Sequence, residues 1–467
     1  MTEPTAENQK KPGAEVPRAE KAVGLSSDFV RSVVAALDER DRARVRHLIA
    51  PLHPADAADL IQRLNDEERH VLVEALHPEI DPKVLSELDE TVRDAVIEQL
   101  GTDEVAAAVT ELDTDDAVDL IEDLDAEVQQ EVLKAIPAVE RVMLETGLAY
   151  PEDSAGRLMQ RELVAVPAFW SVGEVIDHLR TAEDLPDDFY DLFIVDPRHR
   201  PVGKIPLSRV LRTKRPVAVG DIMLAQFITV PVDMDQEEVA FLFRQRDLVS
   251  APVVEADGRL MGVITVDDVV DVIDEEAEED IMHLGGVTGD DLYRAVLATT
   301  RSRFSWLLVN LLTAIVASIV IFQFKDTIEK IVALAVLMPI VASMGGNAGT
   351  QTLTVSVRAL ATKELTPTNA LRIVGKELLV GSFNGILFAI LAGVVAWLWF
   401  DDMALGLVIA AAMIINLVVA GFAGTAIPIG LARTGIDPAV ASTVLLTTIT
   451  DVIGFLAFLG LAAWLLL

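Results

Sequence analysis

Residues 439–467 read AVASTVLLTTITDVIGFLAFLGLAAWLLL, an apolar run with one charged residue, Asp451, near its midpoint. The run is long enough to cross a bilayer as a helix. A carboxylate at that depth is costly, so we expect Asp451 to bind an ion or a proton and to face protein or water. A hydrogen bond to a Ser or Asn of a neighbouring helix is the structural alternative.

Four further apolar stretches precede this run, and together they predict five membrane-spanning helices, over residues 306–324, 328–359, 373–400, 403–431 and 439–467. The second is overlong and holds Pro339 and the run MGGNAGTQ at 344–351. Such residues are tolerated where neighbours or water satisfy the freed backbone, so a broken or kinked helix that lines a cavity is expected. Asn347 and Gln351 fit either pore lining or a contact between helices.

Charge divides the chain into two halves. Of 38 Lys and Arg and 73 Asp and Glu, only nine basic and eight acidic residues lie from residue 301 onward. The acidic half argues against a nucleic-acid partner and permits divalent cations, although a solvated acidic surface has the same composition. The chain has no cysteine, which excludes disulfides and thiolate metal sites. Residues 1–25 lack an apolar core and predict a disordered tail rather than a signal peptide.

The basic residues also predict the orientation in the membrane. They gather before the first span and in the loops after the second and fourth, which places residues 1–300 in the cytoplasm and the C-terminus outside. Glycines 381, 385, 421 and 424 allow close helix packing. Five helices make a thin wall for a path, so a homodimer with the path on its two-fold axis is expected.

Residues 151–273 contain an internal repeat. Met159, Pro167 and Val175 recur 64 positions later, and each copy predicts a strand, a helix, two strands around a glycine turn and a helix. This pattern resembles a pair of cystathionine-β-synthase (CBS) domains, which implies an α/β fold and a possible adenine-nucleotide ligand such as ATP. Thr265 and Asp268 match the nucleotide-binding pattern of these domains, and the same pair would serve as a helix N-cap.

Residues 26–150 predict an acidic superhelix of short α-helices, because LHPADAADLI at 52–61 recurs in altered form as LDTDDAVDLI at 112–121. Asp115 and Asp119 share one face of a helix there, a pattern that is also typical of a solvated face. The repeat is followed, after the CBS pair, by an acidic run over 267–280 without Lys or Arg. Divalent cations would relieve its repulsion, whereas an acidic linker needs none.

Several marks together resemble the MgtE family of magnesium channels and transporters. They are YPEDSAG at 150–156 before the CBS pair, the connector with Glu279 and Asp280, the GGNAGTQ run after Pro339, and Asp437 and Asp451. The resemblance implies four parts: the helical domain 26–150, the CBS pair 151–273, a connecting plug helix 274–300 and an all-α membrane domain 301–467. It also implies a homodimer in the cell membrane with its soluble domains in the cytoplasm.

The resemblance further implies site residues for Mg²⁺. Asp451 and the backbone near Gly345, Gly346 and Asn347 would hold a largely hydrated ion between the second and fifth spans. Intracellular Mg²⁺ would bridge the soluble domains and the plug helix at a larger set of acidic positions. These are Asp115, Asp119, Asp235, Glu237, Asp247, Asp268, Asp271, Glu276, Glu279, Asp280 and Asp437.

The function expected from these residues is a Mg²⁺-selective channel that imports magnesium and is closed by intracellular Mg²⁺. A secondary-active transporter with Asp451 as its proton- or ion-coupling site is the alternative. A membrane-tethered Mg²⁺ or nucleotide sensor without transport is a third possibility. The sequence holds no Ser/His/Asp arrangement, P-loop or HExxH, so an enzyme is not expected.

Overall fold

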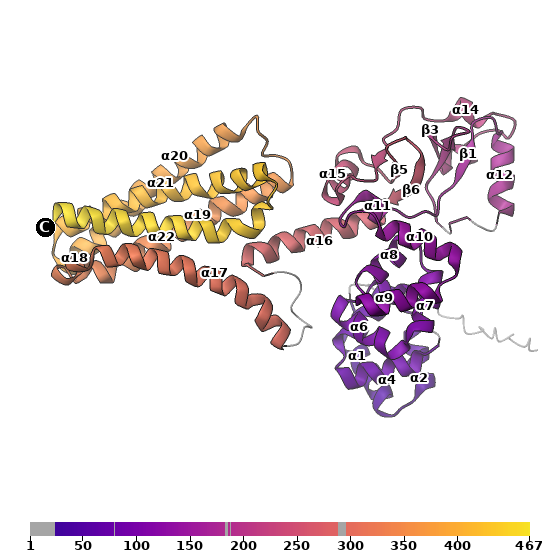
Figure 1. Ribbon diagram of the computed structural model, residues 1–467, viewed down its shortest axis with the longest axis horizontal. Coiled ribbons are helices and arrows are strands. Elements are labelled where there is room, and N and C mark those ends of the chain that lie inside the picture. Colours follow the sequence, from indigo (N-terminus) through magenta and orange to yellow (C-terminus); the bar gives the residue numbers. More distant parts are fainter. Residues whose placement is uncertain (1–23, 79, 183–184, 187, 288–295) are drawn as a thin grey trace, which may run out of the picture. The chain divides into compact units, whose positions relative to one another are not determined.

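The computed structural model describes residues 24–78, 80–182, 185–186, 188–287 and 296–467 (Figure 1). Two compact units contain these residues: one is formed by the chain up to Val239 with Leu248–Val266, the other by Ala240–Asp247 with Asp267–Leu467. Residues 1–23 of the tail expected over 1–25 lie outside the described residues. Residues 288–295 of the expected plug segment lie outside them as well. The multidomain fold expected from the sequence is confirmed, while its domain boundaries stay predictions.

Short α-helices build the first part of unit one. Side chains cap several of them: Ser26 accepts a hydrogen bond from the backbone N–H of Phe29, and Asn65 and Glu68 form a reciprocal capping box. Frequent caps keep each helix short, so that successive helices stack. The helices are α1 (Ser27–Asp38), α2 (Arg42–Ile49), α3 (Pro54–Arg63), α4 (Asp66–Leu76), α5 (Lys83–Ser86), α6 (Glu90–Leu100), α7 (Thr102–Glu111), α8 (Thr114–Glu122), α9 (Ala126–Ala135) and α10 (Ala138–Leu148).

The helical repeat has the same structure in both copies. Its two segments form α3 and α8, and Leu60 and Ile61 of the first copy are as fully buried as Leu120 and Ile121 of the second. The repeated apolar residues therefore form the buried face of each helix, and the acidic residues between them face outward.

The CBS pair forms two small sheets of the same topology. In the first, β1 (Ala165–Pro167) runs parallel to β2 (Asp191–Val195), which pairs antiparallel with β3 (Pro201–Pro206). In the second, β4 (Val230–Pro231), β5 (Ser250–Val254) and β6 (Leu260–Thr265) repeat this order. The helices are α11 (Ala155–Leu158), α12 (Val172–Thr181), α13 (Leu207–Arg212), α14 (Val219–Ile222) and α15 (Gln236–Arg246).

The two copies of this pair pack through exchanged contacts. A Cβ atom on Gly203 of the first copy would lie 2.7 Å from the sulfur of Met223, which opens the second. On Gly262 of the second copy it would lie 2.9 Å from the sulfur of Met159, which opens the first. At Gly262 the backbone oxygen of Gln160 would also lie 2.5 Å from that Cβ, so glycine is required there, whereas at Gly203 a larger residue would displace the Met223 side chain.

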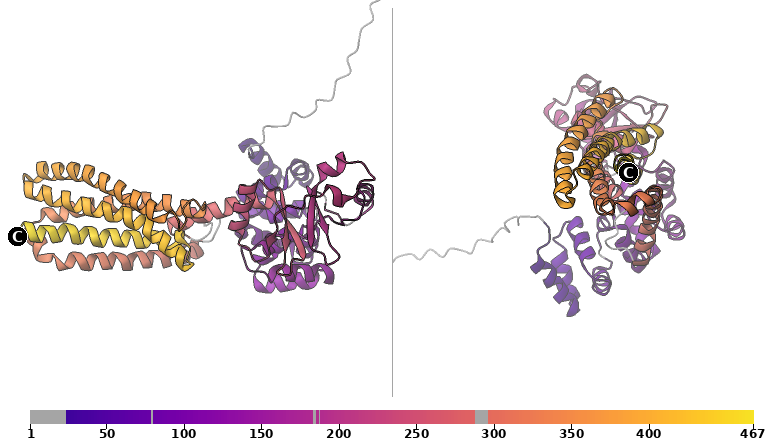
Figure 2. Two further views of the ribbon diagram at one scale, coloured as in Figure 1. Left: turned by 90° about the horizontal axis from the view of Figure 1, so that it is seen from above. Right: turned by 90° about the vertical axis from the view of Figure 1, so that its left-hand side faces the viewer.

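Unit two contains the helices that are long and apolar enough to span a membrane, by length and composition. They lie side by side in both views of Figure 2, and α21 packs against α19, α20 and α22. The helices of this part are α16 (Val266–Gly285), α17 (Val296–Gln323), α18 (Lys325–Lys330), α19 (Ala333–Ala361), α20 (Ala370–Phe400), α21 (Met403–Thr434) and α22 (Pro438–Leu465). The five expected spans correspond to α17 and α19–α22, with ends shifted by a few residues.

Of the two forms expected for the second span, broken or kinked, the broken one is wrong. The helix is not broken at 344–351, because α19 runs without interruption from Ala333 to Ala361, with Pro339 inside it. The overlong apolar stretch is instead divided at residues 331–332, where the short α18 ends before α19 begins. Gly345 and Gly349 of the 344–351 run serve close packing: a Cβ on Gly349 would lie 2.8 Å from Leu446 of α22.

The close packing expected at the other glycines is confirmed. A Cβ on Gly381 of α20 would lie 2.6 Å from the carbonyl oxygen of Leu417 on α21, and one on Gly421 would lie 2.7 Å from that of Glu377. Backbones approach this closely only where no side chain intervenes, so these glycines set the spacing of α20 and α21.

Candidate functional site

Helix α19 carries polar residues on a surface that the rest of the chain leaves exposed. Its most apolar stretch has a mean hydropathy of 1.3, against 2.1 to 2.6 for the other four long helices. The exposed polar residues recur at helical spacing along one face, which we call the polar stripe of α19. It consists of Ser343, Asn347, Thr350, Gln351 and Thr354.

Asn347 makes its side-chain hydrogen bond within its own helix. Its Nδ2 donates a hydrogen bond to Oγ of Ser343 on the same helix, at 3.4 Å, rather than to a neighbouring helix. Gln351 is likewise exposed. The polar contact between helices is therefore not formed in the described part of the chain, and both amides are free to meet water or a second copy.

Asp451 lies half-buried on α22, directly after the fully buried Thr450. The Thr450 hydroxyl donates to the carbonyl oxygen of Leu446 on its own helix, at 3.1 Å. Among the residues that the structure describes, no Ser or Asn side chain hydrogen-bonds the Asp451 carboxylate. The structural alternative for Asp451 is thus not realised within one chain.

The helices that carry the nominated ion-binding residues are neighbours. α19 and α22 pack together, with Leu353 and Val357 of the first in one core with Ala439 and Leu446 of the second. Gly345 is buried in this region, whereas no atom outside its own helix backbone and chain neighbours lies within 4 Å of a Cβ built on Gly346. Gly346 and Asn347 therefore lie on the open side of α19.

Asn416 on α21 is a residue that the sequence analysis did not select. It is 0% exposed, and its Nδ2 donates to the carbonyl oxygen of Val341 on α19 at 2.8 Å. A Cβ on Gly345 of α19 or on Gly454 of α22 would lie 2.2 Å or 2.8 Å from that nitrogen. A lone asparagine in the apolar run 403–431 was the available signal.

Predicted regulatory residues of the connecting helix meet the start of α22. Nδ1 of His283 lies 3.1 Å from a carboxylate oxygen of Asp437, and its Nε2 lies 3.6 Å from Glu279. Burial, and then the charges of Asp437 and Glu279, raise the pKa of Asp280, while His283 lowers it. The structure thus brings Glu279, Asp280 and Asp437 together, with His283, which the sequence analysis did not select, among them.

Other nominated acids lie apart in unit one. Asp235 lies near Asp153, whose pKa is raised by burial and then by the charges of Asp235 and Glu152. Asp119 is paired with the guanidinium of Arg93 at 3.2 Å, and Arg93 also binds Asp123. Asp119 is therefore held by an internal cation, a partner that its spacing from Asp115 did not reveal.

The remaining nominated acids occupy separate positions. Asp115 accepts a hydrogen bond from the backbone N–H of Asp116 at 3.0 Å. Glu237 is in the first turn of α15, and Asp247 follows that helix with a positive φ of 51°. Asp268, Asp271 and Glu276 lie along α16. No group of three or more His, Asp or Glu residues among those described has the arrangement of a metal site.

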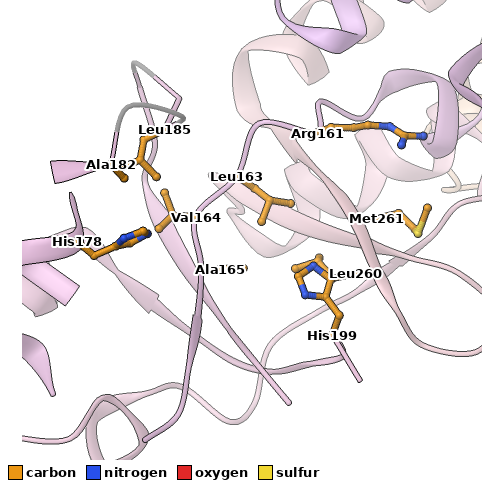
Figure 3. Close-up of a pocket in the computed structure, with 10 residues that line it drawn as sticks. All are labelled: Arg161, Leu163, Val164, Ala165, His178, Ala182, Leu185, His199, Leu260 and Met261. Atoms are coloured by element: carbon orange, nitrogen blue, oxygen red, sulfur yellow. The ribbon is translucent and has the colours of Figure 1, made fainter. Parts of the chain in front are cut away.

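A pocket of about 370 Å³ lies in the CBS pair (Figure 3). Arg161, His178 and His199 supply its cationic or hydrogen-bonding groups among mostly apolar neighbours, and Figure 3 shows the His199 ring beside Leu260. Neither nominated nucleotide residue lines it. Thr265 is buried elsewhere, and its hydroxyl accepts from Nε2 of Gln160 at 3.5 Å.

Three stretches of the chain match models of known families. Residues 338–461 match a divalent cation transporter model named MgtE, residues 52–153 match the MgtE intracellular N domain, and residues 219–275 match the CBS domain. The matches fall on the long helices, the stacked helices and the second CBS copy described above.

Whole proteins are similar as well. The magnesium transporter MgtE of Thermus thermophilus is 36% identical over 451 residues, which cover 93% of this chain and 98% of that protein. The magnesium transporter MgtE of Bacillus subtilis is 32% identical over 332 residues, 71% of this chain and 73% of that protein. A crystal structure of the cytosolic domain of the Mg²⁺ channel MgtE in complex with ATP shares 32% identity at a TM-score of 0.49, covering 52% of this chain and 99% of that one.

Proposed function

The chain belongs to the MgtE family of magnesium transporters, multi-pass membrane proteins with a soluble N-terminal domain, and from this premise we propose a specific mechanism for it. It is a Mg²⁺-selective channel that imports magnesium and is closed when intracellular Mg²⁺ binds its acidic soluble domains. Mg²⁺ is then both the transported ion and the regulator.

The polar stripe of α19 is the observation that carries this proposal. Its side chains lie on a helix of membrane-spanning length, where lipid could not satisfy the hydrogen-bonding groups that they leave unused within α19. Water or a second copy of the chain must therefore cover that face. A homodimer with the two stripes around one axis would enclose a hydrated path and bring two Asp451 carboxylates to it.

This lining suits magnesium in particular. Mg²⁺ dehydrates reluctantly and is often held through its waters. These waters donate hydrogen bonds to the oxygens of amides, hydroxyls and carboxylates. Asn347, Gln351 and the backbone near Gly345 and Gly346 offer such acceptors beside α22. The two carboxylates would supply the charge that attracts a dication and repels anions.

Closure follows from the charges where α16 meets α22. The raised pKa of Asp280 means that its deprotonated form destabilises the contact between α16 and α22. The contact is therefore most stable at low pH and loses stability as the pH rises through that raised pKa. A divalent cation that drew Glu279, Asp280 and Asp437 closer together would offset that repulsion at neutral pH. Intracellular Mg²⁺ would then favour the docked helix, because it binds that state more tightly.

The direct test is flux through the purified full-length protein. Reconstituted in liposomes or recorded by patch clamp, it should carry Mg²⁺ current without a pH or Na⁺ gradient and lose it as cytoplasmic Mg²⁺ rises. Current that needs such a gradient would favour the secondary-active transporter. A protein that binds Mg²⁺ but moves none would be a sensor.

Gating has its own test. The double variant Glu279→Gln/Asp280→Asn should still conduct but lose inhibition by about millimolar Mg²⁺, since the carboxylates that bind the regulatory ion are gone. Glu278→Gln is the matched control, because it removes one exposed charge of the same helix beside them. Retained inhibition in the double variant would remove this contact from the Mg²⁺ sensor.

We also propose that the CBS pair binds ATP. Its pocket offers Arg161 for phosphate and apolar walls for a base, whereas Thr265 and Asp268 match the sequence pattern elsewhere. Equilibrium dialysis with labelled ATP should compare Arg161→Ala with Thr265→Ala/Asp268→Asn. The variant that loses binding identifies the site, and no binding to the unaltered protein would refute the proposal.

A further inference from the structure

Asn416 lies at the junction of three helices, with none of its surface exposed. Its amide fills the space that Gly345 of α19 and Gly454 of α22 leave open, since a Cβ on either glycine would lie within 3 Å of the amide nitrogen. That nitrogen donates to the carbonyl oxygen of Val341 at 2.8 Å. A polar side chain is thus fixed between the two helices that carry the nominated ion-binding residues.

The oxygen of this amide has no such partner. Oδ1 of Asn416 is buried and makes no hydrogen bond within the described chain. Exchanging the amide nitrogen and oxygen would not satisfy it, because the carbonyl of Val341 can only accept and would then face another acceptor. A buried acceptor without a donor destabilises a protein, so a donor from outside the chain is the expected partner.

The neighbours of this oxygen belong to the proposed path. Gly345 is one of the residues nominated for the ion, and Gly454 follows Asp451 by three positions, about one turn of α22. A Cβ on Gly345 would lie 3.0 Å from Oδ1, and one on Gly454 would lie 3.3 Å from it. The unpaired oxygen therefore lies in the packed junction of α19, α21 and α22, close to two segments nominated for the ion.

Building on the proposed function, we propose that Oδ1 of Asn416 accepts a hydrogen bond from a water molecule of the hydrated Mg²⁺ as the ion passes α19 and α22 along the path. An amide oxygen suits this role, because Mg²⁺ keeps several of its waters and each water donates hydrogen bonds. The ion reaches Oδ1 when α19 and α22 move apart, since Asn416 is fully covered here. Asn416 is then a specificity-determining residue of the path.

Two substitutions separate the oxygen from the nitrogen. Asn416→Leu removes both polar atoms at similar volume, whereas Asn416→Asp keeps an oxygen and loses the donor to Val341. Thr425→Val is the matched control, because Thr425 is equally buried on α21 but its hydroxyl is bonded within the helix, to the carbonyl oxygen of Gly421 at 3.3 Å. Each full-length variant is reconstituted in liposomes, and Mg²⁺ and Ca²⁺ flux are measured against concentration alongside the melting temperature.

Loss of one hydrogen bond to the ion's hydration shell should raise the half-saturating Mg²⁺ concentration of Asn416→Leu about tenfold. Its preference for Mg²⁺ over Ca²⁺ should fall, because Ca²⁺ gives up its waters more readily. Its melting temperature should hold or rise, since an apolar isostere removes the unpaired acceptor. Asn416→Asp should keep the half-saturating Mg²⁺ concentration within about threefold of the unaltered protein and should melt at a lower temperature. Thr425→Val should match the unaltered protein in both quantities.

Either of two results would overturn this role. One is an Asn416→Leu protein with unchanged half-saturation and ion preference. The other is a folded Asn416→Asp protein whose half-saturating Mg²⁺ concentration rises as much as that of the Leu variant. That result would make Asn416 only an anchor for α19. If the Leu variant does not fold, the Asp variant alone decides. Failure of the proposed function is recognised separately, because the unaltered protein would then move no Mg²⁺, and the inference would fall with it.

Discussion

Helices α19 and α20 both pack on α21, yet they differ in what they expose. α20 exposes large apolar side chains such as Phe383, Leu387 and Ile390, each at least 59% accessible. α19 exposes its polar stripe at comparable positions along a helix of similar length. The chemistry of an exposed surface, and not the degree of exposure, therefore distinguishes a lipid-facing helix from one that faces water or a second chain.

The buried sides of α19 and α20 also differ in the polarity of the groups that they contact. Gly385 of α20 meets the backbone of Ile414 on α21, a contact without polar side chains. Gly345 of α19 meets the amide of Asn416. Glycine permits close approach in both places, but the group that it admits beside α19 is a polar amide.

The largest expected effect compares two carboxylates, Asp451 of α22 beside α19 and Glu377 of α20. Asp451→Asn should reduce Mg²⁺ flux to that of protein-free liposomes, because the charge that attracts the dication is lost. Glu377→Gln is the matched change on α20, where the partly buried carboxylate pairs with Lys376 at 3.2 Å and accepts from the Thr352 hydroxyl at 3.4 Å, a contact that an amide can keep. Equal loss in both variants would break the distinction between α20 and the helices of the path.

The next test removes the amides of the polar stripe. Asn347→Leu/Gln351→Leu should lower Mg²⁺ flux about tenfold, the effect of one lost hydrogen bond to a charged group, with little change in melting temperature. Leu387→Ala/Ile390→Ala alters the exposed face of α20 to a similar extent and should leave flux unchanged. A tenfold loss in the α20 variant would show that exposed chemistry does not identify the path.

A smaller effect is expected from the packing of adjacent glycines in α19. Gly345→Ala should destabilise the protein by about 1–3 kcal/mol, because its methyl group would overlap the Asn416 amide. Gly346→Ala has open space around its Cβ and should be neutral or slightly stabilising, since alanine favours helices. Thermal melts of both variants measure the difference, and equal melting temperatures would contradict the contact with Asn416.

The smallest effect is predicted within the stripe itself. The Thr350 hydroxyl donates to the carbonyl oxygen of Gly346 on its own helix, at 2.9 Å. Thr350→Val should therefore change Mg²⁺ flux by less than about twofold, in contrast to the amide variants. A loss as large as theirs would mean that the hydroxyl also contacts the ion's waters.

Much of the architecture could be predicted from the sequence, because it depends on local patterns. The long apolar runs predicted the spans, and the recurrence of Met159 and Pro167 at Met223 and Pro231 predicted the paired CBS sheets. The break expected in the second span was wrong for a physical reason. Glycines such as Gly345 and Gly349 can interrupt a helix or let it pack closely, and only the neighbours decide which.

The site was predicted less completely. Asp451 was evident as a lone charge, whereas the pairing of Asp119 with Arg93 joins residues 26 positions apart on different helices. His283 and Asp437 are separated by 154 positions, so no spacing rule relates them. Asn416 was overlooked because a single amide in an apolar run has meaning only once its neighbours are known.

The sequence by itself determined that five helices are long and apolar enough to cross a membrane, that one carries a lone carboxylate, and that an acidic half precedes them. Hydropathy and charge act on each segment alone, whatever its neighbours. Only the tertiary structure decided which face of α19 stays exposed and that Asn416 lies between Gly345 and Gly454. Those features depend on how each helix is rotated about its axis, and that rotation is fixed by the side chains of the helices packed against it.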